Sequence, residues 1–524
     1  MHDSVSTTAA AFCSGLAGGA ALLAAFQHIA RRRALESTRP LDVQDPEAIR
    51  HPAAALTELL VRYHENLQRR DPHRGEPGNT SYSVRSKVKP GELRDQLPTA
   101  CPEDPQSYAD IFRDVEQLIF PALTHWASPN FHAYFKICGS DPSVLADYLC
   151  SSWMSSASRG SQPQQPPSLS KWSATGWLSC LDYPSGVIQG SASESALCAL
   201  IAARHAALEG LEGAEREEKA AKLVVYVSDQ THAIAEKGCM VLDIPHLRVV
   251  PTIRGKADSD NYGLAPDDVA RAMAEDRAKG LVPFCLMPTL GTTSTTAIDP
   301  LRKLVAVARE QPERVWVHLD GAYGGAAAVC PEYQHWLDGV EGCDSICINT
   351  HKWLLVSFDA SLLWVKDRGP LVRALALDPE YLKNEFMQSA RTTRTGKCHS
   401  AVASEHSSSA TGLREHIRRS VALAKQAEEL LMKDGRFKLF VRARMGLVCF
   451  YVAFGGRELN EALLRRVNES GKAFLIHSVV DGVHFLRLAV GGLEVDAWHI
   501  ENVVSVLSNA LTEVIDEDPK WRNL

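Results

Sequence analysis

Lys352 is the residue of this sequence best suited to covalent chemistry. It stands inside an apolar stretch, INTHKWLLV, that covers residues 348–356. Burial of a charged ammonium is costly, and it lowers the pKa of a lysine so that the amine becomes a nucleophile able to form a Schiff base. The alternative is a surface lysine with a buried stem. The apolar residues on both sides of Lys352 argue against that alternative.

Asp320 is a candidate ligand-binding acid. It follows the predicted strand Val315–Leu319 and precedes the small residues GAYGG at 321–325. An acid at the carboxyl end of a strand, followed by small residues, suits a close contact with a ligand. A carboxylate there would keep a pyridine nitrogen protonated, so that a pyridoxal ring could accept electrons. An ordinary turn aspartate is the alternative.

The run GSASE at residues 190–194 is a candidate phosphate site. It opens an Ala-rich helix, and hydroxyls with free N–H groups at the start of a helix attract anions. A plain N-cap followed by a glutamate has the same residues, so the run is a weak signal by itself.

Two more polar residues follow predicted strands. His232 comes just after Leu223–Val227 and could stack on a cofactor ring, although a single histidine is more often structural. Thr293 comes after Phe284–Met287. Four strand ends thus supply polar or reactive residues: His232, Thr293, Asp320 and Lys352. Their convergence is a more specific sign of a binding site than any one of these residues.

A parallel sheet would bring these strand ends together. Short β-branched runs alternate with Ala-rich stretches in the segment 121–370, which is the expected large cofactor-binding domain. Its predicted strands are Leu223–Val227, Phe284–Met287, Val315–Leu319 and Ser345–Ile348, and its predicted helices are Glu194–Leu208, Pro266–Lys279 and Pro300–Glu310. Apolar strands separated by amphipathic helices indicate an α/β fold with a mostly parallel sheet, in which ligands bind at the carboxyl ends of the strands.

Further units are expected on both sides of this domain, since 524 residues are too many for one core. Helices predicted near 45–70 and 108–119 form an N-terminal segment over residues 41–120. Residues 371–524 are expected to form a loop and a small α+β domain, with strands at Leu447–Val452 and Val483–Leu488.

The composition excludes several classes of function. A net charge of -7 with no basic cluster argues against a nucleic-acid-binding protein. The 13 cysteines are scattered, and Cys343 and Cys347 are their only close pair, so no metal site is expected. Metalloprotease, P-loop and nucleophile-elbow motifs are absent from the sequence. Spread cysteines in a chain of this size suit a reducing compartment, and a cytoplasmic enzyme is expected.

The first 40 residues differ from the rest. Residues 9–26 are apolar or small, and three arginines follow at 31–33. A run of this length is at the lower limit for a membrane span. A membrane anchor, a cleaved targeting peptide and an unstructured tail all stay open. An anchor would keep the catalytic body on the cytoplasmic side.

Several motifs resemble those of the group II pyridoxal-phosphate (PLP)-dependent amino-acid decarboxylases, and most closely those of the aromatic-L-amino-acid decarboxylases. They occur in order along most of the chain after Val88: VKPGELR at 88–94, THW at 124–126, HAYF at 132–135, GVIQGSASE at 186–194, SDQTH at 228–232, TLGTT at 289–293 and NTHKWLLV at 349–356. The resemblance implies the fold of PLP enzymes of type I, like that of aspartate aminotransferase, and a homodimer.

The resemblance also implies a role for each matching residue. Lys352 would carry PLP as a Schiff base, Asp320 would pair with its ring nitrogen and His232 would stack on the ring. Other cofactor contacts would come from Ser191, Ala192, Ser193, Asn349 and His351 around the phosphate, and from Thr293 and Ala322 against the ring. Tyr381 would match the mobile-loop tyrosine that returns a proton to the substrate. The side-chain pocket would be lined by Trp126, Tyr134 and Phe135.

The expected reaction is decarboxylation of an L-amino acid to an amine and CO2, with an aromatic substrate of the tryptophan, DOPA or tyrosine type. Related aldehyde synthases typically have phenylalanine at the place of Tyr381. The tyrosine of this chain therefore favours simple decarboxylation. Two alternatives stay open: a decarboxylase of the same group that acts on histidine, glutamate or a sulfinate, and an inactive PLP-fold protein that acts as a binding partner.

Three segments depart from the family pattern. Lys136-Ile137 replaces a Pro-Thr pair, which removes a hydroxyl expected near the substrate carboxylate. Residues 155–179 are Ser/Gln/Pro-rich where the family has a helix. Residues 392–406 read TTRTGKCHSAVASEH. A coding sequence for the family-like DYKDWQMPLSRRFRA, read one base late, yields these same letters.

We therefore hypothesise that residues 392–406 are family sequence in the wrong reading frame, through a splice or gene-model error, and that 155–179 share this origin. Sequencing the transcript tests the hypothesis, because an uninterrupted message that encodes residues 392–406 as printed would refute it.

Overall fold

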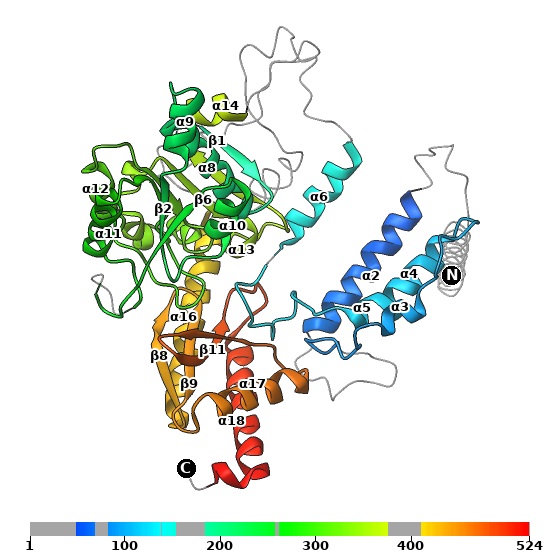
Figure 1. Cartoon of the computed structure of the whole chain (residues 1–524). Coiled ribbons are helices and arrows are strands. Elements are labelled where there is room, and N and C mark those ends of the chain that lie inside the picture. The colour runs from blue at the N-terminus through cyan, green and yellow to red at the C-terminus, as the bar shows by residue number, and fades with distance from the viewer. Residues whose placement is uncertain are drawn as a thin grey trace, which may run out of the picture. The chain divides into compact units, whose positions relative to one another are not determined.

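The computed structural model describes residues 49–68, 82–137, 139–153, 183, 185–256, 261–375 and 410–522. The chain divides into two compact units, Met1–Ser128 and Pro129–Leu524 (Figure 1). Several sequence predictions lie outside the described residues: the leader 1–40, the segment 155–179, Tyr381 and the segment 392–406. The domain boundaries expected near residues 120 and 370 stay predictions.

The described part of the first unit is helical. Its elements are α2 (Arg50–Gln68), α3 (Glu92–Gln96), α4 (Tyr108–Asp114), the π-helical turn η1 (Val115–Ile119) and α5 (Phe120–Ala122). Tyr63 on α2 ties the unit together, because its ring lies 4.6 Å from that of Phe120 and its hydroxyl lies 2.8 Å from His125 Nδ1. The two helices predicted for this region are confirmed.

The second unit contains a seven-stranded sheet of order β1-β7-β6-β5-β4-β2-β3. Its strands are β1 (Ser185–Gln189), β2 (Leu223–Ser228), β3 (His246–Val250), β4 (Val282–Leu286), β5 (Trp316–Asp320), β6 (Ser345–Asn349) and β7 (Ser361–Val365). The strands β2 to β6 pair in parallel, which confirms the predicted mostly parallel sheet. β7 and β1 are antiparallel to their neighbours. The return from β6 to β7 is too short for the crossover that a parallel strand needs.

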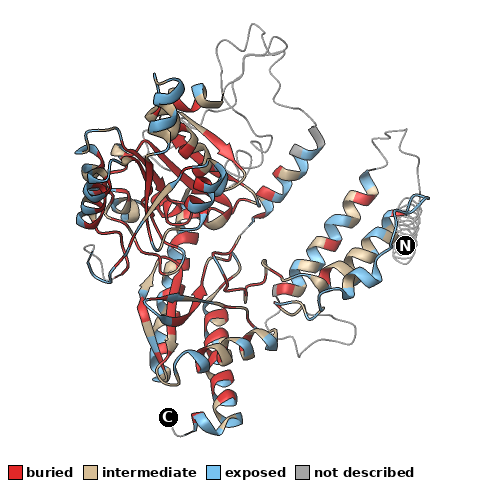
Figure 2. Cartoon of the chain, in the orientation of Figure 1, coloured by how far each residue is buried: buried red, intermediate tan, exposed pale blue. Residues whose placement is uncertain are grey.

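Helices and apolar side chains cover the sheet. The main helices are α8 (Ala192–Ala207), α9 (Gly213–Ala220), α10 (Ile234–Val241), α11 (Pro266–Ala278), α12 (Leu301–Arg309) and α14 (Gly369–Leu375). Every residue of β2, β5, β6 and β7 is buried (Figure 2). Burial on both faces explains why these strands read as continuous apolar runs instead of alternating patterns.

The C-terminal part forms the predicted α+β arrangement. Its helices are α16 (Ala410–Asp434), α17 (Gly456–Ser470) and α18 (Ala497–Glu517), and its strands are β8 (Phe437–Arg444), β9 (Leu447–Val452), β10 (Ile476–Val480) and β11 (Val483–Ala489). The four strands make an antiparallel sheet of order β10-β11-β9-β8. Asp496 caps α18 by accepting a hydrogen bond from the backbone N–H of His499. No helix within the described ranges has both the length and the apolar character to cross a membrane.

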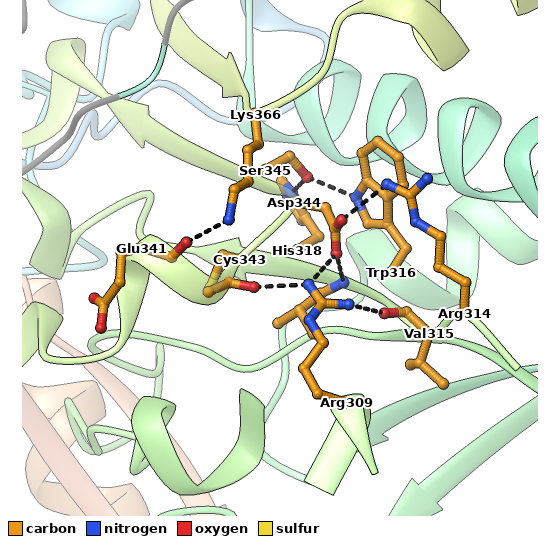
Figure 3. A network of polar contacts seen from close by, with 12 residues as sticks. Arg309, Arg314, Val315, Trp316, His318, Glu341, Cys343, Asp344, Ser345 and Lys366 are labelled. Atoms are coloured by element: carbon orange, nitrogen blue, oxygen red, sulfur yellow. Dashed lines mark hydrogen bonds and ion pairs between the residues drawn. The ribbon is translucent and has the colours of Figure 1, made fainter. Parts of the chain in front are cut away.

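The buried carboxylate of Asp344 links β5 and β6 near the amino-terminal ends of these strands (Figure 3). The side chain is 5% exposed. It accepts hydrogen bonds from Arg309 Nη2 at 2.8 Å, from Arg314 Nη2 at 3.1 Å and from the Val317 N–H at 2.8 Å. Because both strands carry site residues at their other ends, this network helps to fix the site.

We expect the Asp344→Asn variant to lose about 2 kcal/mol of unfolding free energy. Loss of one partner from a buried ion pair costs more than that, but both arginines are partly exposed and can be hydrated. Urea unfolding followed by fluorescence measures the change. Asp338→Asn is the control, because Asp338 pairs with Arg302 at the surface. An equal shift in both variants would contradict the assignment.

Candidate active site

Polar side chains gather at the carboxyl edge of the seven-stranded sheet. His232 follows β2, Thr293 follows β4, Asp320 is the last residue of β5 and Lys352 follows β6. Because these strands are parallel neighbours, their ends meet at one edge. His232 and Lys352 are close enough to Asp320 to interact electrostatically with it. The strand ends thus converge as predicted, whereas His232 and Thr293 themselves are exposed.

Asp320 is fixed by its backbone and by one of its carboxylate oxygens. Its N–H donates to the Pro288 carbonyl at 2.9 Å, and its carbonyl accepts from the Leu290 N–H at 2.8 Å. Oδ1 accepts from the Ala322 N–H at 3.0 Å and lies 3.8 Å from Cys347 Sγ. Oδ2 makes no hydrogen bond within the described residues, so this oxygen is available to a ligand.

Lys352 lies on the short helix α13 (Thr350–Trp353). Its amine makes no hydrogen bond or ion pair with the described part of the chain, although some of the side chain remains accessible to solvent. Desolvation lowers the pKa of this amine, while Asp320 and Cys347 oppose the effect. A lowered pKa increases the fraction of neutral, nucleophilic amine near neutral pH.

The start of α8 is open to an anion. Ser191 is the N-cap and accepts from the Glu194 N–H at 3.2 Å. The N–H groups of Ala192 and Ser193 make no hydrogen bond within the described residues, as is usual for the first turn of a helix. An anion placed here would therefore meet free donors and the positive end of the helix dipole.

Asn349 and His351 lie beside this helix start. A side chain at Gly190 would come within 2.8 Å of Asp359, and the next residue, Ala360, donates its N–H to His351 Nδ1 at 2.9 Å. His351 Nε2 lies 3.3 Å from Asn349 Nδ2. Burial lowers the pKa of His351 to about 4, so the ring is neutral at physiological pH. The predicted phosphate residues thus come from the ends of β1 and β6, the two strands that flank β7.

An aromatic stack borders Lys352. The rings of Phe135 and Tyr323 are 3.6 Å apart and nearly parallel, and Tyr323 and Trp353 are 4.8 Å apart. Lys352 Nζ lies 5.9 Å from the centre of the Phe135 ring. Phe135, which was predicted to line the side-chain pocket, therefore lies near Lys352, whereas Tyr323 and Trp353 were not assigned to the site.

Arg487 is a further residue at the site, and its position there was not predicted from the sequence. This arginine lies on β11, is only 2% exposed, and its guanidinium carbon is 5.2 Å from the centre of the Phe135 ring. Nε and Nη2 are buried without a hydrogen-bond partner among the described residues. A charged residue inside the apolar run FLRLAV at 485–490 was the available signal, because a buried guanidinium needs an anion.

The other predicted pocket residues behave differently. The Tyr134 side chain is exposed and lies near Phe131, with the ring centres 6.5 Å apart. Trp126 belongs to the first unit, whose position relative to the site is not defined.

Lys136 is buried, and a side chain at Gly492 would come within 2.6 Å of its Nζ. The lysine that replaces the family's proline thus occupies space beside the loop after β11.

The arrangement fits PLP. The cofactor needs an amine for its aldehyde, a carboxylate for its ring nitrogen and donors for its phosphate. The site has the Lys352 amine, a carboxylate oxygen of Asp320 without a hydrogen bond, and the free N–H groups of Ala192 and Ser193. The described residues contain no cluster of side chains able to hold a metal ion.

Comparisons with known proteins agree with this chemistry. The sequence model of the family described as "Pyridoxal-dependent decarboxylase conserved domain" matches residues 90–165 and 167–453. Tryptophan decarboxylase 2 of Oryza sativa subsp. japonica is 34% identical over 92% of this chain and 97% of its own length. Phenylacetaldehyde synthase of Petunia hybrida is 34% identical over 90% and 96%, respectively. The crystal structure of Oryza sativa TDC with PLP and tryptamine has a TM-score of 0.81 and 32% identity, with 91% of this chain and all of that chain (100%) covered.

Proposed function

Since this chain belongs to the pyridoxal-dependent decarboxylase family, whose members are PLP-dependent carboxy-lyases, we propose that it converts an aromatic L-amino acid to the amine and CO2. The observation that carries the proposal is that Lys352 and Asp320 stand at the carboxyl ends of neighbouring parallel strands, close enough to interact electrostatically, beside an aromatic stack. The names of its relatives favour an aromatic substrate such as tryptophan or tyrosine, and DOPA stays a predicted alternative.

The residues of this chain would divide the work as follows. When bound, PLP supplies a ring that accepts the electron pair of the bond that breaks. Lys352 would hold the cofactor covalently, Asp320 would keep the proton on the ring nitrogen, and His232 would lie against the ring. The remaining cofactor contacts would come from Ser191, Ala192, Ser193, Thr293, Ala322, Asn349 and His351. Tyr381 stays the predicted donor of the proton that replaces CO2.

Arg487 would bind the carboxylate of the substrate. Desolvation lowers the pKa of its guanidinium, and arginine side chains keep their charge in proteins. The buried charge and the two unpartnered nitrogens would be stabilised by an anion on the Phe135 side of the site. The substrate carboxylate is the anion that the proposed reaction brings there.

We expect Arg487→Met to reduce kcat/KM about 10- to 100-fold, mainly through a higher KM, because hydrogen bonds to a charged group stabilise binding by roughly 1.5–3 kcal/mol. Steady-state kinetics measure this. Arg442→Met, an exposed arginine of β8 in the same sheet, is the control. An unchanged KM for Arg487→Met would remove Arg487 from substrate binding.

The proposed enzyme is a homodimer. α6 (Asp141–Trp153) exposes an apolar face made of Val144, Leu145, Tyr148 and Leu149, with Leu145 63% exposed. A second copy of the chain would cover such a face. Light scattering in solution tests this, with twice the chain mass of 57.4 kDa as the expected value.

The function is tested by product analysis of the purified chain with added PLP. The substrate panel is L-tryptophan, L-DOPA, L-tyrosine, L-histidine and L-glutamate, with mass spectrometry as the readout. An amine from one of the first three supports the proposal. An amine from histidine or glutamate supports the alternative, a decarboxylase of the same group that acts on that amino acid. An aldehyde with ammonia contradicts simple decarboxylation. No product from any of them, with PLP bound, would support an inactive PLP-fold protein.

A further inference from the structure

Cys347 lies directly beside Asp320 on the neighbouring strand. The two residues are register partners in the parallel β5–β6 pair, so their side chains point to the same face of the sheet. Cys347 Sγ is 3.8 Å from Asp320 Oδ1, within the range of a sulfur hydrogen bond. An ionised carboxylate can only accept, so the thiol must be the donor.

The backbone holds this thiol in place. The Gly321 N–H donates to the Cys347 carbonyl at 3.0 Å. A side chain at Gly321 would lie only 3.0 Å from the same oxygen, so glycine allows the ends of β5 and β6 to approach. Cys347 is 0% exposed. Burial raises the pKa of its thiol well above the ordinary value, so the sulfur keeps its proton at working pH.

The two oxygens of Asp320 thus have different surroundings. Oδ1 receives the Ala322 N–H at 3.0 Å and the Cys347 thiol, while Oδ2 has no hydrogen bond within the described residues. We propose that Cys347 is a positioning residue for the reaction: its thiol holds Asp320 Oδ1, so that Oδ2 faces the ring nitrogen of PLP. This inference rests on the proposed pairing of Asp320 with that nitrogen.

The competing explanation is that the thiol only fills space. Cys285 provides the matched comparison, because it is a fully buried cysteine on β4, the strand on the other side of β5, and makes no hydrogen bond through its side chain within the described residues. Its replacement by alanine leaves a cavity of the same size in the same sheet without a change at Asp320. A packing role predicts equal effects for Cys347→Ala and Cys285→Ala, whereas a positioning role does not.

The test uses the PLP-loaded enzyme and four variants: Cys347→Ala, Cys347→Ser, Cys285→Ala and Asp320→Asn. The first measurement is the absorbance of the bound cofactor as a function of pH, which reports the protonation of the PLP group. The second is the dissociation constant of PLP, and the third is kcat. We expect Cys347→Ala to shift the spectral titration and to lower kcat about twofold to tenfold, a modest effect because a thiol is a weak hydrogen-bond donor. Cys347→Ser keeps a donor and should restore both, and Cys285→Ala should change neither.

Three outcomes overturn the inference. Equal spectra for Cys347→Ala and the unmodified enzyme, with a clear shift for Asp320→Asn, would refute the role of Cys347 but not the pairing of Asp320 with the ring nitrogen. Equal titrations for Asp320→Asn and the unmodified enzyme would refute the pairing of Asp320 with the ring nitrogen, and the inference with it. A shift in Cys285→Ala as large as that in Cys347→Ala would assign the effect to packing.

Discussion

Replacement of Lys352 by alanine should reduce decarboxylation by at least about 10³-fold, the scale on which a positioned acid–base or nucleophilic group contributes. The amine of Lys352 is enclosed, has a lowered pKa and lies beside Asp320, and no other described lysine combines these features. The variant should still bind PLP, because the groups around the phosphate are unchanged. It should not retain PLP covalently after borohydride reduction, which mass spectrometry of the tryptic peptide measures.

Lys425→Ala is the control for this experiment, since Lys425 is exposed on α16. It should keep both activity and the covalent cofactor. A Lys352→Ala enzyme that still forms amine at an appreciable rate, or that still carries reduced cofactor on another lysine, would contradict the assignment of Lys352.

Replacement of Asp320 by asparagine should reduce kcat about 10- to 1,000-fold. An opposite charge within contact distance raises the pKa of a cationic group by roughly 1–3 units, and each unit is tenfold in the protonated fraction. Asparagine keeps the size of the side chain and a carbonyl for the Ala322 N–H, so the change isolates the charge. Stopped-flow or steady-state assays of amine formation measure the loss.

A buried carboxylate away from the site gives the matched control. Asp276 on α11 is buried and accepts a hydrogen bond from the Tyr226 hydroxyl at 3.2 Å. Asp276→Asn should lower stability without lowering kcat per bound PLP. Equal losses of kcat in the two variants would mean that Asp320 acts through the fold and not on the cofactor.

The sheet and its catalytic edge could be predicted because both are local in the sequence. Apolar runs of strand length mark β2, β4, β5 and β6. A polar residue that follows such a run in the sequence comes at or just after the carboxyl end of that strand. The structure has all four strands within one or two residues of the prediction. The roles of His232, Thr293, Asp320 and Lys352 stay predictions, but their convergence followed from strand order and direction alone.

The remaining part of the site depends on contacts between distant segments. Phe135, Tyr323 and Arg487 meet only because the four-stranded sheet packs near the end of β5, and no short motif encodes that packing. In the sequence, Arg487 stands out only as a charge inside the apolar run at 485–490, which does not reveal the residues that it meets in space. The antiparallel β7 was missed for a related reason, because its direction is set by the length of the return loop and not by its own residues.

The site is assembled from two sheets, and this division has an evolutionary consequence. Lys352 and Asp320 belong to the seven-stranded sheet, whereas Arg487 belongs to the four-stranded sheet. Because the proposed role of Arg487 is to bind the substrate carboxylate, mutations in β11 would change how that carboxylate is held without disturbing the groups proposed to serve the cofactor. Descendants of such a chain could therefore change how tightly they bind the acid group of a substrate through the small sheet, while they inherit the reaction through the large one.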